Sequence, residues 1–518
     1  MSTRRARSLA ARPLMEDLEG RRLLAATFRG TDIDGDTYTL RLVGPGDLRV
    51  TLVNANGTAH ADASTPALIN RITIAGSDPT QTRLIGRVTK GANGNGKVFF
   101  NNLTEEGGRS EGTPANNGLQ AIDAPNFWLG STVAAASTTD PHAISIPDGV
   151  NTLRFGGVDT TFTIPGGTAP GSNGTAVPFT VNLGLPRSVG TSIIVDQVIS
   201  SAQAAATTGG TATQNGVTFV VVGRINLFQA NAIQGNAALP GTGFQGGGGT
   251  LVVSTLTGDQ SITGQIGFVR VGGNATNFSV ETNDKVTNTY IGGETNNFTL
   301  LAPNGSRSLY FGKGLDNSTI RTHEITSLSA NRGAVGSNIT VDRGAGTVRF
   351  GGDVVNTNFL TGIQQGLGTV FTNQALPTNP SSVQDGGNIQ QLLVAGNVFD
   401  SVFTASVDPS GGVYGTANDL TLPHGIIRGK IEGSINNAST VTQNPKEALF
   451  AHSVSQTGGP VTPPNVPEAP FPNPGAPPKG PRVARGLQAS AGGAASSSVS
   501  ATRGVVAAGL KIAKARKA

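Results

Sequence analysis

The chain has no cysteine, and this absence excludes several functional classes. A disulfide framework, a thiolate metal site and a cysteine nucleophile are all impossible. Its five histidines stand singly along the 518 residues, so no spacing places two of them on one face of a short element. A zinc site is therefore not expected.

Charged residues are also scarce, at 13% of the chain against the roughly 25% that is typical of soluble domains. The formal charge of +5 is unevenly distributed, because residues 1–26 carry +3 and residues 479–518 carry +8, which leaves −6 for the residues between them. A mildly acidic body with basic ends does not match a nucleic-acid-binding domain, which gathers Lys and Arg on a folded face. We expect no specific nucleic-acid partner.

Long apolar runs are absent as well. No stretch reaches the roughly eighteen consecutive apolar residues of a membrane-spanning helix, so no transmembrane segment is expected. The chain instead is rich in glycine, at 73 positions, and in Asn and Thr. Its hydrophobic residues are mainly Val, Ile, Leu and Phe, which suit a pleated, half-buried surface. The expected fold class is therefore all-β.

A repeat of about twenty residues is clearest between Gly267 and Gly362. Short strand-like runs end in a glycine at positions 272, 292, 312 and 351, and the last gap contains one intervening rung, 328–341, with displaced glycines. One such coil cannot bury its apolar face alone and must stack on its neighbours. The period predicts a right-handed parallel β-helix (β-solenoid) whose inward column contains Val271, Ile291, Phe311 and Phe350.

The corners of each rung are expected to depend on glycine and asparagine. Glycine adopts positive φ without steric cost, and Asn side chains at equivalent corners can stack as a hydrogen-bonded ladder between rungs. Degenerate copies of the repeat lie on both sides of the clear block, so we predict one solenoid over residues 27–445. Such a body resembles bacterial parallel β-helix surface proteins.

The two ends have a different composition. Ten prolines between Pro460 and Pro481 predict a semi-rigid linker over residues 446–482. Residues 483–518 are rich in Ala, Ser and Gly, carry basic residues, and are expected to be disordered. This basic tail is a candidate tether to anionic polysaccharide or lipid.

The first residues resemble a known sorting motif. After an arginine-rich start, the segment Leu18-Glu19-Gly20-Arg21-Arg22-Leu23-Leu24 is similar to the LEPR-XLL motif near the N-termini of planctomycete surface and extracellular proteins. It departs from the motif at Gly20, where the family has proline. The resemblance implies that residues 1–26 are an export or sorting segment and that the protein is extracellular or lies on the cell surface.

Two short motifs have the spacing of ligand sites. Asp32, Asp34 and Asp36 alternate around Gly35, which could bring three hard oxygen ligands together for Ca²⁺; a solvated acidic turn is the simpler alternative. The segment Gly91 to Lys97 has the Gly-x4-Gly-Lys spacing of a phosphate-binding loop. The hydroxyl residue that should follow is Val98, so a hairpin turn is expected there.

The sequence favours a non-enzymatic structural or adhesive protein that contacts the cell envelope or extracellular matrix. The main alternative is a carbohydrate-active β-helix enzyme, which would need paired carboxylates, and Asp342-Arg343 with Asp353 on the next rung is the candidate set. A ligand-binding module is the other alternative. An exposed row of aromatics would favour sugar binding, but the chain has one Trp and four Tyr.

Overall fold

The computed structural model describes residues 26–454, with gaps at 55–58, 61–64, 107–117, 132–141, 163–178, 185–189, 201, 204–212, 215–216, 236–248, 255–263, 363–386, 409–419, 422–426, 436–439 and 443–449. The described residues form strands and turns and no helix, which confirms the all-β class. Accordingly, the described part contains no helix that could cross a membrane. The predicted sorting segment, most of the proline-rich linker and the basic tail lie outside the described residues.

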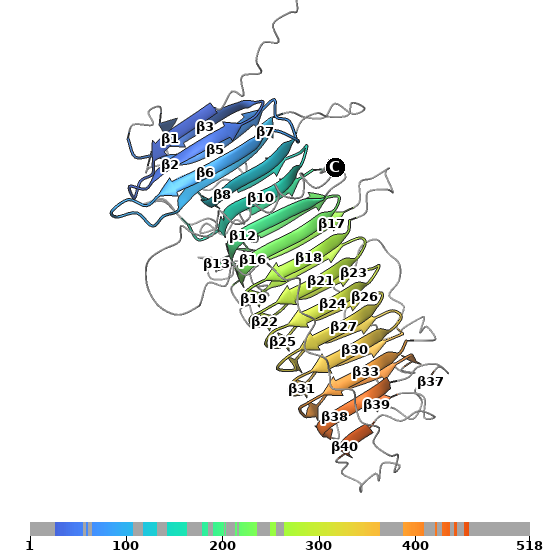
Figure 1. Cartoon of the computed structure of the whole chain (residues 1–518). Coiled ribbons are helices and arrows are strands. Elements are labelled where there is room, and N and C mark those ends of the chain that lie inside the picture. Colours follow the sequence, from blue (N-terminus) through green and yellow to red (C-terminus); the bar gives the residue numbers. More distant parts are fainter. Residues whose placement is uncertain are drawn as a thin grey trace, which may run out of the picture. The chain divides into compact units, whose positions relative to one another are not determined.

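The central rungs each contain three short parallel strands (Figure 1). The first such rung consists of β18 (Ile266–Val271), β19 (Ala275–Thr276) and β20 (Phe278–Thr282). Each strand pairs in parallel with its counterpart one rung later, which builds three sheets. The later rungs are β21 (Val286–Ile291), β22 (Thr295–Asn296) and β23 (Thr299–Ala302); β24 (Ser306–Phe311), β25 (Leu315–Asp316) and β26 (Thr319–Thr322); β27 (Ile325–Ala330), β28 (Ala334–Val335) and β29 (Asn338–Val341); β30 (Ala345–Phe350), β31 (Val354–Val355) and β32 (Asn358–Thr361); and β33 (Ile389–Val394), β34 (Val398–Phe399) and β35 (Val402–Ala405).

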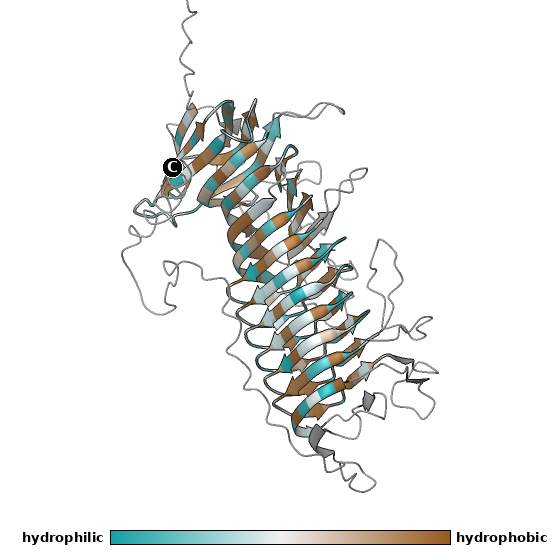
Figure 2. Ribbon diagram, turned by 45° about the vertical axis from the view of Figure 1, so that its right-hand side comes forward, coloured by the Kyte–Doolittle hydropathy of each residue, from teal (hydrophilic) through white to brown (hydrophobic). Residues whose placement is uncertain are grey.

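The predicted inward column is confirmed. Val271 is in register with Ile291, and Ile291 with Phe311. Ala330 supplies the intervening rung between Phe311 and Phe350. All five side chains are fully buried, and Figure 2 shows the alternation of hydrophobic and hydrophilic positions along these strands. Stacking at about 4.8 Å gives each side chain an apolar neighbour above and below.

The rungs before β18 have a longer first strand. This strand is β8 (Leu119–Leu129), β10 (Val150–Asp159), β12 (Thr191–Ser200) or β16 (Ile225–Gly235). β16 pairs with both β18 and β19, so one long strand here occupies the positions of two separate strands in the later rungs. The accompanying strands are β7 (Val98–Glu106), β9 (His142–Ile146), β11 (Phe179–Leu183), β15 (Val217–Val222) and β17 (Gly249–Ser254).

The N-terminal strands pair differently from the rest of the predicted body. β2 (Thr37–Val43) lies antiparallel to both β1 (Ala26–Thr31) and β6 (Arg83–Thr89). β3 (Asp47–Val53) lies antiparallel to β4 (Ala59–His60) and β5 (Leu68–Ala75). Parallel stacking starts where β5 meets β7 and β6 meets β8. Antiparallel hairpins thus cover the first edge of the parallel stack, where unpaired backbone groups would otherwise be exposed.

The last described strands continue the stack past residue 445. β38 (Ile427–Ile435) pairs with β33 and β34, and β39 (Thr440–Thr442) pairs with β35. β40 (Phe450–Val454) pairs in parallel with β38, so it lies within the range predicted as linker. Two small antiparallel pairs stand apart from the main sheet: β13 (Ala202–Gln203) with β14 (Thr213–Gln214), and β36 (Val407–Asp408) with β37 (Leu420–Thr421).

The corners differ from the expectation in which residue takes positive φ. The glycines at 272, 292, 312 and 351 do not have positive φ. The left-handed corner residue in successive rungs is instead Asn277, Asn297, Asn317, Gly336, Asn356 and Asp400. The expected Asn ladder forms over one step here, because Asn297 Nδ2 donates to Asn277 Oδ1 at 2.6 Å, whereas Asn317 Nδ2 donates to Asn296 Oδ1 at 3.2 Å. Asn tolerates the left-handed region because its short polar side chain hydrogen-bonds locally.

Candidate metal site

The three aspartates predicted as metal ligands lie in the turn between β1 and β2. Asp32 N donates to Asp36 O at 2.9 Å, and Gly35, with φ of 93°, closes the turn by donating to Asp32 O at 3.1 Å. Asp32 Oδ1 in turn accepts the backbone N–H groups of Asp34 at 3.2 Å and Asp36 at 2.9 Å. The local sequence thus forces the acidic side chains onto one side of the hairpin end.

The structure brings the three carboxylates together. One oxygen from each of Asp32, Asp34 and Asp36 lies within 4.8 Å of the others. Asp32 and Asp36 are 4% and 0% exposed, so this is not the solvated acidic turn that was the simpler alternative. Ca²⁺ binds carboxylate oxygens at about 2.3–2.6 Å, so two oxygens bound to one ion lie no farther apart than about twice that distance. The separations of the three carboxylates meet this condition.

The glycine-rich segment that resembles a phosphate-binding loop holds one of these carboxylates. Gly91 N donates to Asp36 Oδ1 at 2.7 Å, and Gly96 N donates to Asp36 Oδ2 at 2.5 Å. Asn95 N donates to Asp34 Oδ2 at 3.1 Å. A β-carbon on Gly94 would collide with the Asp36 carboxylate, which explains glycine there. The anion that this loop binds is therefore a side chain of the same chain.

The electrostatics of the turn favour a bound cation or a bound proton. Burial raises the pKa of Asp32 to about 8, and the neighbouring carboxylates of Asp34 and Asp36 add to the shift. Asp34 Oδ1 is buried and accepts no hydrogen bond within the described residues. Without a cation, a proton on Asp32 lowers the negative charge of the three carboxylates. A bound divalent cation would neutralise that charge instead. Asp36, with both oxygens engaged by N–H groups, is the ligand of the three with the least free capacity.

The acids considered for catalysis do not form a pair. Asp342 follows β29 and lies 3.5 Å from His323 Nδ1. Asp353 follows β30 and accepts the backbone N–H of Asn397 at 2.7 Å. The two carboxylates thus lie at opposite ends of β30, whose six residues span about 20 Å. They are too far apart for the carboxylate pair of a glycosidase.

A second buried acidic cluster was not predicted. Ser77 Oγ donates to Glu105 Oε1 at 2.6 Å and accepts from Gly118 N at 3.3 Å. Burial raises the pKa of Glu105, and the nearby Asp148 carboxylate raises it further. Glu105 and Asp148 are 3% and 5% exposed. The three side chains come from three successive rungs, so no local spacing in the sequence indicates the cluster.

Comparison of the chain with family models, with curated proteins and with solved structures finds no significant match to any of them.

Proposed function

We propose that the protein is an exported, non-enzymatic structural or adhesive component of the cell surface or extracellular matrix. The observation that carries the proposal is the repeated strand register from β18 to β35, in which each rung adds one copy of the same outward faces. Such stacking yields broad, uniform surfaces that suit an extended partner.

The outward side chains support the same proposal. In the sheet that contains β20, one outward column has hydroxyl residues at Thr180 and Thr218 on two consecutive rungs, and again at Ser279, Thr299 and Thr319 on three consecutive rungs. Repeated small polar side chains make a hydrated surface suited to multivalent contact. A cavity between the first rungs, lined by Leu40, Ile72, Phe127 and other apolar side chains, measures about 10 Å³, which is too small for a substrate.

The resemblance of residues 18–24 to a surface-sorting motif supports export, and the basic tail supports retention. The eight positive charges of residues 479–518, without an acid, suit an anionic polysaccharide or lipid surface of the envelope. Each Lys or Arg near such a surface contributes about 1 kcal/mol, screened within a Debye length.

Deletion of residues 479–518 tests this attachment. The shortened protein should keep the melting temperature of the full chain, because the tail is not expected to pack on the body. Its retention on isolated envelope fractions should fall, and retention of the full chain should decrease steeply with salt. Equal retention of both proteins at every salt concentration would remove the tethering role.

A further inference from the structure

The outward face of the sheet that contains β18 is basic over its central strands. We call face A the outward side chains of β18, β21, β24, β27, β30 and β33, which occupy the second, third and fifth positions of each strand. These six strands contain no Asp or Glu. They contain three arginines, Arg270, Arg307 and Arg349.

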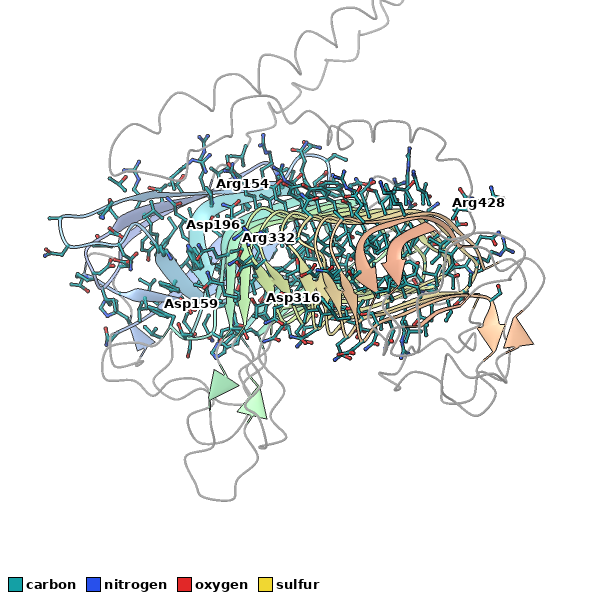
Figure 3. All side chains as sticks on the ribbon, turned by 90° about the horizontal axis from the view of Figure 1, so that it is seen from below. Arg154, Asp159, Asp196, Asp316, Arg332 and Arg428 are labelled. Atoms are coloured by element: carbon teal, nitrogen blue, oxygen red, sulfur yellow. The ribbon has the colours of Figure 1, made fainter. Side chains whose placement is uncertain are left out.

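These arginines lie on alternate rungs. They belong to β18, β24 and β30, so successive guanidinium groups are offset by two rungs, or about 10 Å, along the stack. Arg428, two rungs beyond β30 on β38, continues the alternation. Figure 3 labels Arg428 and also Arg154, from the earlier strand β10, and both lie along the upper side of that view.

The arginines also alternate across the face. Arg270 and Arg349 occupy the fifth position of their strands and Arg307 the second, a lateral offset of three residues, or about 10 Å. Between these two edges runs a row of neutral side chains in the third position, with hydroxyl and amide groups after the first: Phe268, Asn288, Ser308, Ser327, Thr347 and Gln391. Face A is therefore a straight polar track with positive charge on both sides.

Arg307 and Arg349 have no carboxylate partner within the described residues. Both are exposed, and neither forms an ion pair or side-chain hydrogen bond there. A guanidinium group presents a planar fork of donors that matches a carboxylate in a bidentate geometry. Their charge is thus available to an external anion.

Two tyrosines make part of the track rigid. Tyr290 and Tyr310 stack with ring centroids 5.1 Å apart and planes inclined by 5°. The Arg270 guanidinium lies 6.0 Å from the Tyr290 ring, and Asn331 Nδ2 donates to the Tyr310 hydroxyl at 2.8 Å. Because these side chains are already ordered, a ligand that contacts them loses little conformational entropy.

We propose that face A binds a linear polysaccharide that carries carboxylate groups, laid along the stack of rungs. The arginines bind the carboxylates, the neutral row hydrogen-bonds sugar hydroxyls, and Tyr290 and Tyr310 supply apolar contact. This inference rests on the proposed surface function and names its partner class. It places the binding surface on the folded body, separate from the basic tail.

The charge density of face A favours a polysaccharide over a nucleic acid. Duplex DNA carries one charge per about 1.7 Å of its axis, and its binding is dominated by neutralised phosphates. Face A offers one arginine per about 10 Å along the stack, next to a row of uncharged hydroxyl and amide groups. A sparsely charged polymer rich in hydroxyl groups is the better complement.

The test compares two double variants of the full chain on immobilised polygalacturonate. Arg307→Gln with Arg349→Gln removes two charges from face A. Arg49→Gln with Arg71→Gln removes two exposed charges from β3 and β5 and serves as the matched control. Both variants retain residues 479–518, so the contribution of the tail is the same in both. The methyl ester of the polymer tests the need for carboxylates, and single-stranded DNA and anionic phospholipid vesicles serve as competitors.

The face A variant should bind polygalacturonate about tenfold or more weakly than the unchanged chain, because two charge-assisted contacts are lost. The control variant should bind like the unchanged chain, the methyl ester should bind poorly, and the difference between the two variants should persist when DNA or vesicles occupy the basic tail. Equal binding of polygalacturonate by the two variants, or an equally large loss of DNA or vesicle binding in the face A variant, would overturn the proposal. Cellular location is measured independently, so a cytosolic protein that still shows the tenfold effect would refute the surface function and leave face A intact.

Discussion

Gly312 lies directly against Gly292 of the preceding rung, and a β-carbon on Gly312 would approach the Gly292 carbonyl oxygen to under 3.0 Å. The glycine that ends the first strand of these rungs is therefore needed for close backbone approach between coils. Positive φ is not the reason, since neither residue adopts it. The stack consequently depends on contacts between rungs at this corner.

Gly312→Ala should lower the free energy of unfolding by about 1–3 kcal/mol, the usual cost of forcing an extra methyl group into a packed site. Gly314→Ala is the matched control two residues away, where the nearest atom to a β-carbon is 3.5 Å distant. The control should be neutral or slightly stabilising, because alanine restricts the unfolded chain. Urea titration of both variants checks this, and equal stability of the two would argue against the close approach.

The Asn corners can be tested at Asn297, which has φ of 56°. Asn297→Ala should destabilise the protein by about 1–2 kcal/mol, because alanine is disfavoured in the left-handed region and loses the bond to Asn277. Asn297→Gly relieves the backbone cost and loses the same side-chain bond, so it should be less harmful. A glycine variant less stable than the alanine variant in thermal melts would contradict this ranking.

Calcium should raise the melting temperature through the Asp32–Asp36 turn, since an ion that binds the folded state stabilises it by mass action. Millimolar Ca²⁺ against chelator is the comparison. Asp32→Asn combined with Asp34→Asn should abolish the shift. A midpoint that does not respond to Ca²⁺ would leave these carboxylates as a turn stabilised by the glycine loop and a bound proton.

The Glu105 cluster predicts a pH dependence of stability. Because burial raises the pKa of Glu105 above its usual value of 4.5, the folded state binds this proton more tightly than the unfolded chain. Its contribution is fully present below about pH 4.5 and is lost as pH rises through the folded pKa. Glu105→Gln cannot ionise, so it should gain stability relative to the unchanged chain as pH increases. Urea titrations at acidic and mildly alkaline pH measure this, and parallel curves for the two proteins would count against it.

The sequence predicted the fold where the repeat is local. The column of Val271, Ile291 and Phe311 follows from the twenty-residue spacing, because equivalent positions of a solenoid must stack. The antiparallel pairing of β1 to β5 was not predicted, because alternating apolar residues are equally compatible with parallel and antiparallel partners.

The sites were harder to predict because their parts are distant in the chain. The acidic turn is visible as a local motif, but its loop partners Gly91 and Gly96 lie 55 and 60 residues from Asp36. Face A consists of positions about twenty residues apart in the chain. Which residues belong to it depends on which side of each strand faces outward. That orientation becomes known when the strand register is known.

Export of the protein to the cell surface can be measured by fractionation of cells that make it, with detection of the full chain in envelope, medium and cytosol. An exported surface protein should be recovered in the envelope fraction or the medium, and protease added to intact cells should digest it. Recovery in the cytosol, protected from protease until the cells are lysed, would contradict export.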